Sequence, residues 1–138
     1  MENLIGVVAD DTTGANDIGV MFSKSKSTVK VVTFEENLKL EKDANVIIVD
    51  TDSRLDSLEL SYQKVYHAAK MLEQLGCTMY INKTCSVFRG NIGSEFDAML
   101  DALNEEFAEG KTVGDWNAMH SGKLIRDTNI APLPRYVG

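Results

Sequence analysis

The sequence predicts a Rossmann-like α/β fold, with a mostly parallel sheet, flanking helices and an irregular C-terminal tail. Two observations predict it. Short apolar runs alternate with segments of helical periodicity over the first two thirds of the 138-residue chain. Several of these runs are also apolar on both faces, as in Val46 to Val49. A strand needs that pattern when helices cover both sides of its sheet, which is the arrangement of parallel sheets.

Four segments have the composition of buried strands. Each is short and rich in Val, Ile or other β-branched residues, and polar residues or a turn follow it. These segments are Leu4 to Ala9, Thr28 to Phe34, Val46 to Val49 and Cys77 to Ile81.

Three helices are expected between and after these strands. Asp56, three residues before Glu59, resembles a capping box at the start of the second helix, and Gly76 is placed to end it. The predicted buried stripes are Ala15, Ile18, Met21 and Phe22 in the first helix, Tyr62, Val65, Ala69 and Leu72 in the second, and Ile92, Phe96, Met99, Leu100, Leu103 and Phe107 in the third.

Residues 108–138 have a different pattern from residues 1–107, which we assign to the α/β domain. Glycines and prolines interrupt this tail, and it contains no strand-like apolar run. A structureless stretch of this length is unusual inside a compact domain. It either wraps irregularly around the sheet or packs against a part of the protein that this chain lacks.

Composition excludes several classes of function. The formal net charge of −7 disfavours nucleic acid as a partner, because an acidic surface repels phosphates. Apolar runs fall far short of the roughly 20 residues that span a bilayer, so no membrane partner is expected. The N-terminus lacks the features of a signal peptide, which favours a cytoplasmic location. Cys77 and Cys85 are expected to be reduced thiols, and no metal-ligand spacing surrounds them.

Polar clusters follow the first, third and fourth predicted strands, where open α/β sheets bind ligands. They comprise Asp10 to Asp17, Asp50 to Arg54, and Asn82 to Asn91. Carboxylates could accept hydrogen bonds from hydroxyl groups or take a proton as general base. Arginine and lysine side chains, with a helix N-terminus, could bind a carboxylate. Together these demands fit a small sugar acid.

Each cluster also has a simpler interpretation. Asp10 and Asp11 could only cap the first helix. Asp50 and Asp52 could be solvated loop acids paired with Arg54. Lys83 and Arg89 could be ordinary exposed cations. His67 is expected at the surface, His120 lies in the tail without an acid partner nearby in sequence, and Cys85 is expected to line the pocket. The sequence contains no nucleotide phosphate loop of a known pattern.

Three motifs carry a resemblance to a known family. They are ADD-x-TGAND at Ala9 to Asp17, DTDSR at Asp50 to Arg54, and RGN-x-G at Arg89 to Gly93. In this order they resemble the N-terminal sugar-binding domain of the four-carbon acid sugar kinases, which include threonate, erythronate and 3-oxo-tetronate kinases. The similarity spans roughly residues 4 to 107.

The resemblance implies ATP-dependent phosphorylation of a short sugar acid. This domain would bind the acid, and a separate C-terminal domain, absent here, would bind ATP and Mg²⁺; this chain alone would bind no cofactor and would be inactive. The candidates for the catalytic base are Asp10, Asp11 and Asp17. The implied substrate-binding residues are Asp10, Asp11, Thr13, Asp17, Asp50, Ser53, Arg54, Lys83, Arg89 and Asn91.

The sequence departs from the family pattern at two places. Many members have KK-x-DS-x-LRGN, whereas Asn82 here replaces the first Lys and Cys85 replaces the Asp. After the third helix the family continues with an apolar strand and an F-P-x-x-G-R-T-T segment, whereas Ala108 to Val113 follows here. We therefore expect one strand of the sheet to be deleted.

Two other functions fit parts of the pattern. A receiver-like phosphoacceptor domain would use Asp50 after the third strand, together with Lys83. A non-catalytic remnant could act as an interaction module, because a missing strand leaves an unpaired sheet edge that recruits another copy or another chain.

Overall fold

The fold is described from a computed structural model, which places residues 4–85, 87, 89–103 and 124–127. Its elements in chain order are β1 (Ile5–Ala9), α1 (Thr12–Lys24), β2 (Val29–Thr33), β3 (Val46–Asp50), α2 (Leu58–Leu75), β4 (Met79–Lys83), α3 (Ile92–Ala102) and β5 (Leu124–Asp127). Strands and helices alternate as the sequence predicts, except that β3 follows β2 with no helix between them, and the α/β class is confirmed.

The described strands form one parallel sheet in the order β2-β3-β1-β4-β5. From β1 the chain crosses to β2 at one edge of the sheet, whereas from β3 it crosses to β4 on the other side of β1. The connections after β1 and β3 therefore leave in opposite directions. A crevice forms at such a reversal, beyond the carboxyl ends of the strands.

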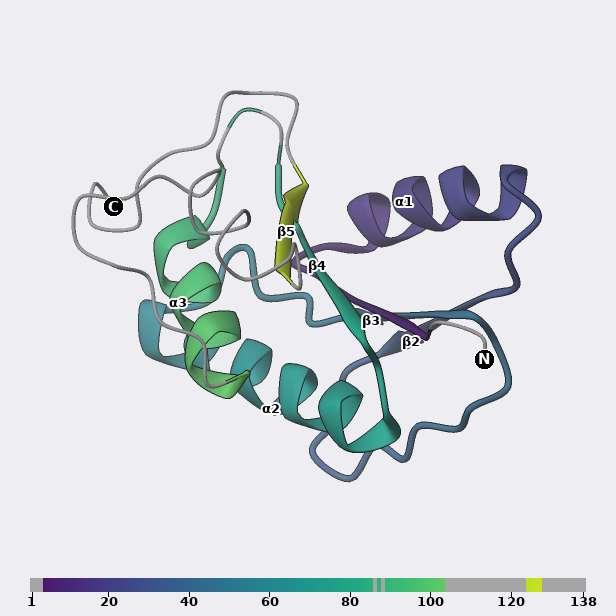
Figure 1. The fold of residues 1–138 in the computed structure, drawn as a ribbon. Helices are drawn as coiled ribbons and strands as arrows, with labels where there is room; N and C mark the ends of the chain where they lie inside the picture. The colour runs from purple at the N-terminus through teal and green to yellow at the C-terminus, as the bar shows by residue number, and fades with distance from the viewer. Residues whose placement is uncertain (1–3, 86, 88, 104–123, 128–138) are drawn as a thin grey trace.

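Helices cover both faces of the sheet (Figure 1). On one face α1 packs over Val7, Val46 and Ile48. On the other face α2 and α3 pack over Val8 and Ile47 and against each other. Neighbouring residues of one strand thus enter different cores, which is why β1 and β3 are apolar without interruption.

The ends of α2 follow local rules. Ser57, not Asp56, is the N-cap, and its side chain accepts a hydrogen bond from the Leu60 amide, so the predicted capping box is wrong by one residue. Gly76 ends the helix as predicted, with φ of 105°. The Cys77 amide donates to the Leu72 carbonyl in a Schellman motif. Because this motif uses Cys77, β4 begins at Met79, two residues later than predicted, and reaches Lys83.

Other expectations from the sequence need correction. Met21 is 68% exposed, because Gly14, Ala15, Ile18 and Gly19 form the buried side of α1. The tail is not irregular throughout, because residues 124–127 form β5 and pair with β4 from Tyr80 to Lys83. The expectation that a strand beside β4 is deleted is therefore wrong, because β5 occupies that position. The edge of β4 is paired, so it gives no reason to expect an oligomer formed through it. Phe107 and the rest of the tail lie outside the described residues.

Two further findings concern the whole described chain. Cys77 and Cys85 are both free and buried, as expected of reduced thiols. Within the described ranges, no helix combines the length and apolar character that crossing a bilayer requires.

Candidate functional site

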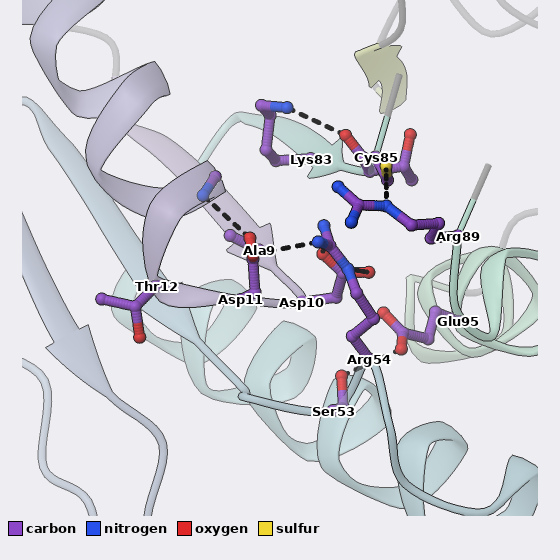
Figure 2. Close-up of polar contacts among 12 residues, drawn as sticks. Ala9, Asp10, Asp11, Thr12, Ser53, Arg54, Lys83, Cys85, Arg89 and Glu95 are labelled. Atoms are coloured by element: carbon purple, nitrogen blue, oxygen red, sulfur yellow. Dashed lines mark hydrogen bonds and ion pairs between the residues drawn. The ribbon is translucent and has the colours of Figure 1, made fainter. Parts of the chain in front are cut away.

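The three predicted clusters come together at the carboxyl edge of the sheet (Figure 2). The loop after β3 is tied to the end of β1, because the Ser53 and Arg54 amides donate to the Asp10 carbonyl at 3.0 and 3.2 Å. The loop after β4 reaches the same place, because the backbone of Gly90 lies against Arg54 and Asp10. A Cβ added to Gly90 would lie 2.9 Å from Arg54 Cγ and 3.3 Å from Asp10 Oδ2.

Arg54 lies between two carboxylates. Its Nη2 contacts Asp10 Oδ1 at 2.9 Å, its Nε donates to Asp10 Oδ2 at 3.3 Å, and its Nη1 contacts Asp11 Oδ2 at 3.0 Å. The Asp10 side chain is 4% exposed and that of Arg54 is 16% exposed. The two-pronged contact expected with a ligand carboxylate is thus made with Asp10, and the partners of Arg54 are not the loop acids Asp50 and Asp52.

Groups from two other segments, the end of β1 and the loop after β4, act on the charge of Arg54. Burial lowers the pKa of Arg54, but Asp10, Asp11 and Cys85 raise it, and the net direction is upward. Burial also raises the pKa of Asp10, an effect that Arg54 opposes and that Asp11 reinforces. The net pKa of Asp10 lies above its ordinary value, so the ionised form of this carboxyl is less favourable than that of an exposed aspartate.

Asp11 and Asp50 hold the loops in place. Asp11 is the N-cap of α1, and its Oδ1 accepts a hydrogen bond from the Gly14 amide at 2.8 Å, so the capping interpretation holds for this residue. Asp50 is buried, and its two oxygens accept hydrogen bonds from Thr12 Oγ1 at 2.7 Å and from the Asp52 amide at 2.9 Å. This arrangement does not favour Asp50 as an accessible phosphoacceptor.

Glu95 is a buried acid of the site that the sequence analysis did not single out. It lies in the first turn of α3, is 2% exposed and contacts the buried Ser53 hydroxyl at 2.9 Å. Asn91 also joins α3 to this loop, because its Nδ2 donates to the Asp56 carbonyl at 2.8 Å. An acid in a first helical turn usually interacts with the helix dipole at the surface, so the sequence carried no signal of burial.

The end of β4 and the loop after it contribute one cation each. The Lys83 side chain packs beside Gly14, because a Cβ added to Gly14 would lie 3.6 Å from Lys83 Cγ. The Nζ of Lys83 donates to the Thr84 carbonyl at 2.8 Å. Arg89 is exposed, and its Nε donates to Cys85 Sγ at 3.2 Å. The thiol that replaces the family's aspartate thus accepts a hydrogen bond from an arginine, as a carboxylate would.

Other candidate residues lie apart from this network. Thr13 and Asp17 are exposed on α1, and within the described part of the chain neither joins the hydrogen bonds around Asp10. His67 is exposed, as expected, and borders a separate groove of about 440 Å³ between α2 and the segment after β2. His120 lies outside the described residues. Among residues 4–85, 87, 89–103 and 124–127, no three His, Cys, Asp or Glu side chains are grouped as a metal ion requires.

The Cys85 thiol provides a chemical probe of the third loop. Burial raises its pKa, but the Arg89 side chain and the backbone amides of Val87 and Arg89 lower it, to about 7 overall. We expect Arg89→Gln to return this pKa toward 9 and to slow alkylation of Cys85 by iodoacetamide at pH 7 about tenfold or more. Cys77 is the internal control, because burial raises its pKa to about 11. Peptide mass spectrometry follows the alkylation of Cys85 in wild type and in Arg89→Gln. Equal alkylation rates in the two proteins would show that Arg89 does not act on the thiol.

The fold and the site define a class of protein: a parallel α/β domain with paired acidic and basic residues at the reversal in strand order. The family described as the sugar-binding N-terminal domain matches residues 5–119. The chain belongs to this family, and the resemblance noted from its motifs is confirmed. The match extends beyond residue 107 and does not test the boundary between the α/β domain and the tail, which stays a prediction.

Curated relatives are kinases of four-carbon sugar acids. The chain is 32% identical over 108 residues to a 3-oxo-tetronate kinase of Haemophilus influenzae, covering 75% of this chain and 26% of the relative. It is also 32% identical over 149 residues to a D-erythronate kinase of Heliobacterium modesticaldum, covering 98% of this chain and 33% of the relative. The chain therefore spans a quarter to a third of the length of these relatives and corresponds to their sugar-binding domain.

The fold also matches a solved structure. A domain of unknown function from Bordetella bronchiseptica, crystallised with bound citrate as a domain-swapped dimer, superposes with a TM-score of 0.68 and 29% sequence identity. The match covers 75% of this chain and 27% of that one.

Proposed function

We propose that this chain is the substrate-binding part of an ATP-dependent kinase that phosphorylates a four-carbon sugar acid of the threonate, erythronate or 3-oxo-tetronate class. The observation that carries the proposal is the convergence of three loops on Arg54. They bring the acids Asp10 and Asp11 and the cations Lys83 and Arg89 to one edge of the sheet. Acids can bind the hydroxyl groups of a sugar acid, and cations can bind its carboxylate.

We propose different roles for the two arginines. The guanidinium of Arg54 is held by Asp10 and Asp11, so Arg54 orients these acids. Arg89 is exposed on the neighbouring loop, where its guanidinium can meet a ligand from solvent. We therefore propose Arg89, together with Lys83, as the site of the sugar-acid carboxylate.

Phosphoryl transfer consists mainly of positioning and of neutralising negative charge, and it requires both the acceptor and the donor site. Among the described residues, no three His, Cys, Asp or Glu side chains are grouped as an all-protein metal site requires. We assign ATP and Mg²⁺ to the part of a full-length kinase that lies beyond the sugar-binding domain. Asp10 and Asp11 remain the candidates for accepting the hydroxyl proton, because both lie beside Arg54, whereas Asp17 does not join this network.

Calorimetry can test the proposal. We expect the purified chain to bind D-erythronate or D-threonate with a Kd in the millimolar range or tighter, and not to bind erythritol, which lacks the carboxylate. Arg89→Gln should weaken binding about tenfold or more, since a charge-assisted hydrogen bond contributes roughly 1.5–3 kcal/mol. Lys30→Ala, at a surface ion pair with Asp43, is the matched control and should bind normally. Equal binding of the acid and erythritol would contradict the proposed carboxylate site.

A further inference from the structure

The two arginines of the site have partners of different kinds. Asp10 and Asp11 hold Arg54, so carboxylates already compensate the charge of its guanidinium. Arg89 instead donates from Nε to Cys85 Sγ at 3.2 Å (Figure 2). Within the described ranges, no acidic side chain forms an ion pair with Arg89. The proposed function uses the charge of Arg89 but gives its sulfur partner no role.

The contact between Cys85 and Arg89 holds only the inner nitrogen of the guanidinium. Cys85 is 6% exposed, whereas Arg89 is exposed, so a buried sulfur anchors a cation that faces solvent. Among the residues that the structure describes, none accepts a hydrogen bond from the two terminal nitrogens of Arg89. A carboxylate binds a guanidinium most strongly through two parallel N–H contacts. The sulfur therefore leaves in place the donors that a ligand carboxylate needs.

The charge on the sulfur decides how much of the Arg89 charge a ligand meets. A neutral thiol accepts the hydrogen bond and cancels no charge, whereas a thiolate forms an ion pair with Arg89, as Asp10 does with Arg54. The charged groups around the sulfur are Arg89 from its own loop and Arg54 from the loop after β3, with Asp10 and Asp11 against Arg54. Both forms of Cys85 are accessible, because its pKa is about 7.

We propose that Cys85 is a positioning residue for the ligand carboxylate: as a thiol it orients Arg89 through Nε and leaves the charge and the terminal nitrogens to the ligand, and as a thiolate it takes that charge for itself. The consequence for ligand binding rests on the proposed function, whereas the pairing of Cys85 with Arg89 does not. Ionisation of Cys85 should weaken the binding of a sugar acid, and by linkage a bound sugar acid should raise the pKa of the thiol.

Calorimetry with D-erythronate at two pH values tests the proposal. The ligand carboxylate is ionised at both, because carboxylic acids titrate near about pH 4. Wild type should bind about tenfold more weakly at pH 9 than at pH 6. Glu95 also titrates in this range, because burial raises its pKa to about 8. Cys85→Ser, whose hydroxyl stays neutral, is therefore the control and should bind at both pH values about as wild type does at pH 6. A serine variant that keeps the pH dependence of wild type would overturn the proposal.

The variant Cys85→Asp separates charge from packing. It gives Arg89 a partner of the kind that Arg54 already has, with a negative charge at both pH 6 and pH 9. We expect Cys85→Asp to bind D-erythronate about tenfold more weakly than Cys85→Ser at pH 6, since the carboxylate competes with the ligand for the guanidinium. Equal affinities of the two variants at pH 6 would show that Cys85 only fills space beside Arg89, against the proposal.

Carbon-detected NMR of the ligand-free chain distinguishes failure of this inference from failure of the proposed function. The ¹⁵Nε resonance of Arg89 should shift between pH 6 and pH 9 with a midpoint near 7 in wild type and should stay constant in Cys85→Ser. If the resonance behaves in this way but no sugar acid binds at any pH, the proposed function fails and the pairing of Cys85 with Arg89 stands. If D-erythronate binds but the Arg89 resonance of wild type does not titrate, the role of Cys85 is refuted and the proposed function stands.

Discussion

Replacing Arg54 with Ala is expected to lower the free energy of unfolding by about 3–5 kcal/mol, because removing one partner of a buried ion pair leaves the other charge uncompensated. Asp10, with a side chain 4% exposed, would lose two contacts to the guanidinium, and Asp11 would lose one. This loss is a large part of the stability of an ordinary domain. Urea unfolding at pH 7, followed by circular dichroism, measures it.

Lys30→Ala is the matched control for this experiment. Lys30 pairs with Asp43 at 2.8 Å, a distance similar to that of the Arg54 contacts, but the two side chains are 38% and 48% exposed. We expect its free energy of unfolding to stay close to that of wild type, since solvent screens exposed pairs. Similar losses in both variants would show that burial of the Arg54 pair has no special importance for stability.

Replacing Gly90 with Ala is expected to abolish most sugar-acid binding while the fold survives. Gly90 has φ of 94°, a conformation that costs other residues roughly 1–3 kcal/mol. Its added Cβ would lie 2.9 Å from Arg54 Cγ, 3.3 Å from the Arg54 carbonyl and 3.3 Å from Asp10 Oδ2. Arg54 must then move away from Asp10. We expect binding of D-erythronate, measured by calorimetry, to weaken about tenfold or more.

Gly76→Ala separates backbone strain from damage to the site. Gly76 ends α2 with a similar φ of 105°, and its added Cβ would meet only the flexible end of Lys42, at 3.0 Å from Nζ. Both variants therefore share the strain, but only Gly90→Ala disturbs Arg54. Gly76→Ala should lose stability and keep its affinity. A similar loss of affinity in both variants would indicate that strain alone, at any place in the fold, impairs binding.

The alternation of strands and helices could be predicted because each element carries its own local signal. Val46 to Val49 is apolar on both faces, and Gly76 stands where a left-handed residue is required. The meeting of the three polar clusters also followed from the sequence, because the carboxyl ends of parallel strands share one edge. Strand β5 escaped prediction because Leu124 and Ile125 are its two apolar residues, too short a run to signal a strand. Its pairing with β4 joins residues distant in the chain.

The partners of the site residues could not be predicted from local patterns. Arg54 lies four residues from Asp50 in sequence, which suggested a loop pair, but the fold brings Asp10 from 44 residues away. Glu95 and Ser53 are 42 residues apart, and neither shows in the sequence that it is buried. Separations of this size depend on tertiary packing, so local patterns in the sequence could not show which of these residues bond to one another.

The central claim is that a sugar acid binds where the loops after β1, β3 and β4 meet. Titration of the ¹⁵N-labelled chain with D-erythronate, followed by amide chemical shifts, tests it most directly. The account predicts that the largest shifts fall on residues 10–13, 51–56 and 83–91. Shifts confined to the groove lined by Phe34, Leu60 and Met71, or no shifts at several millimolar ligand, would contradict it.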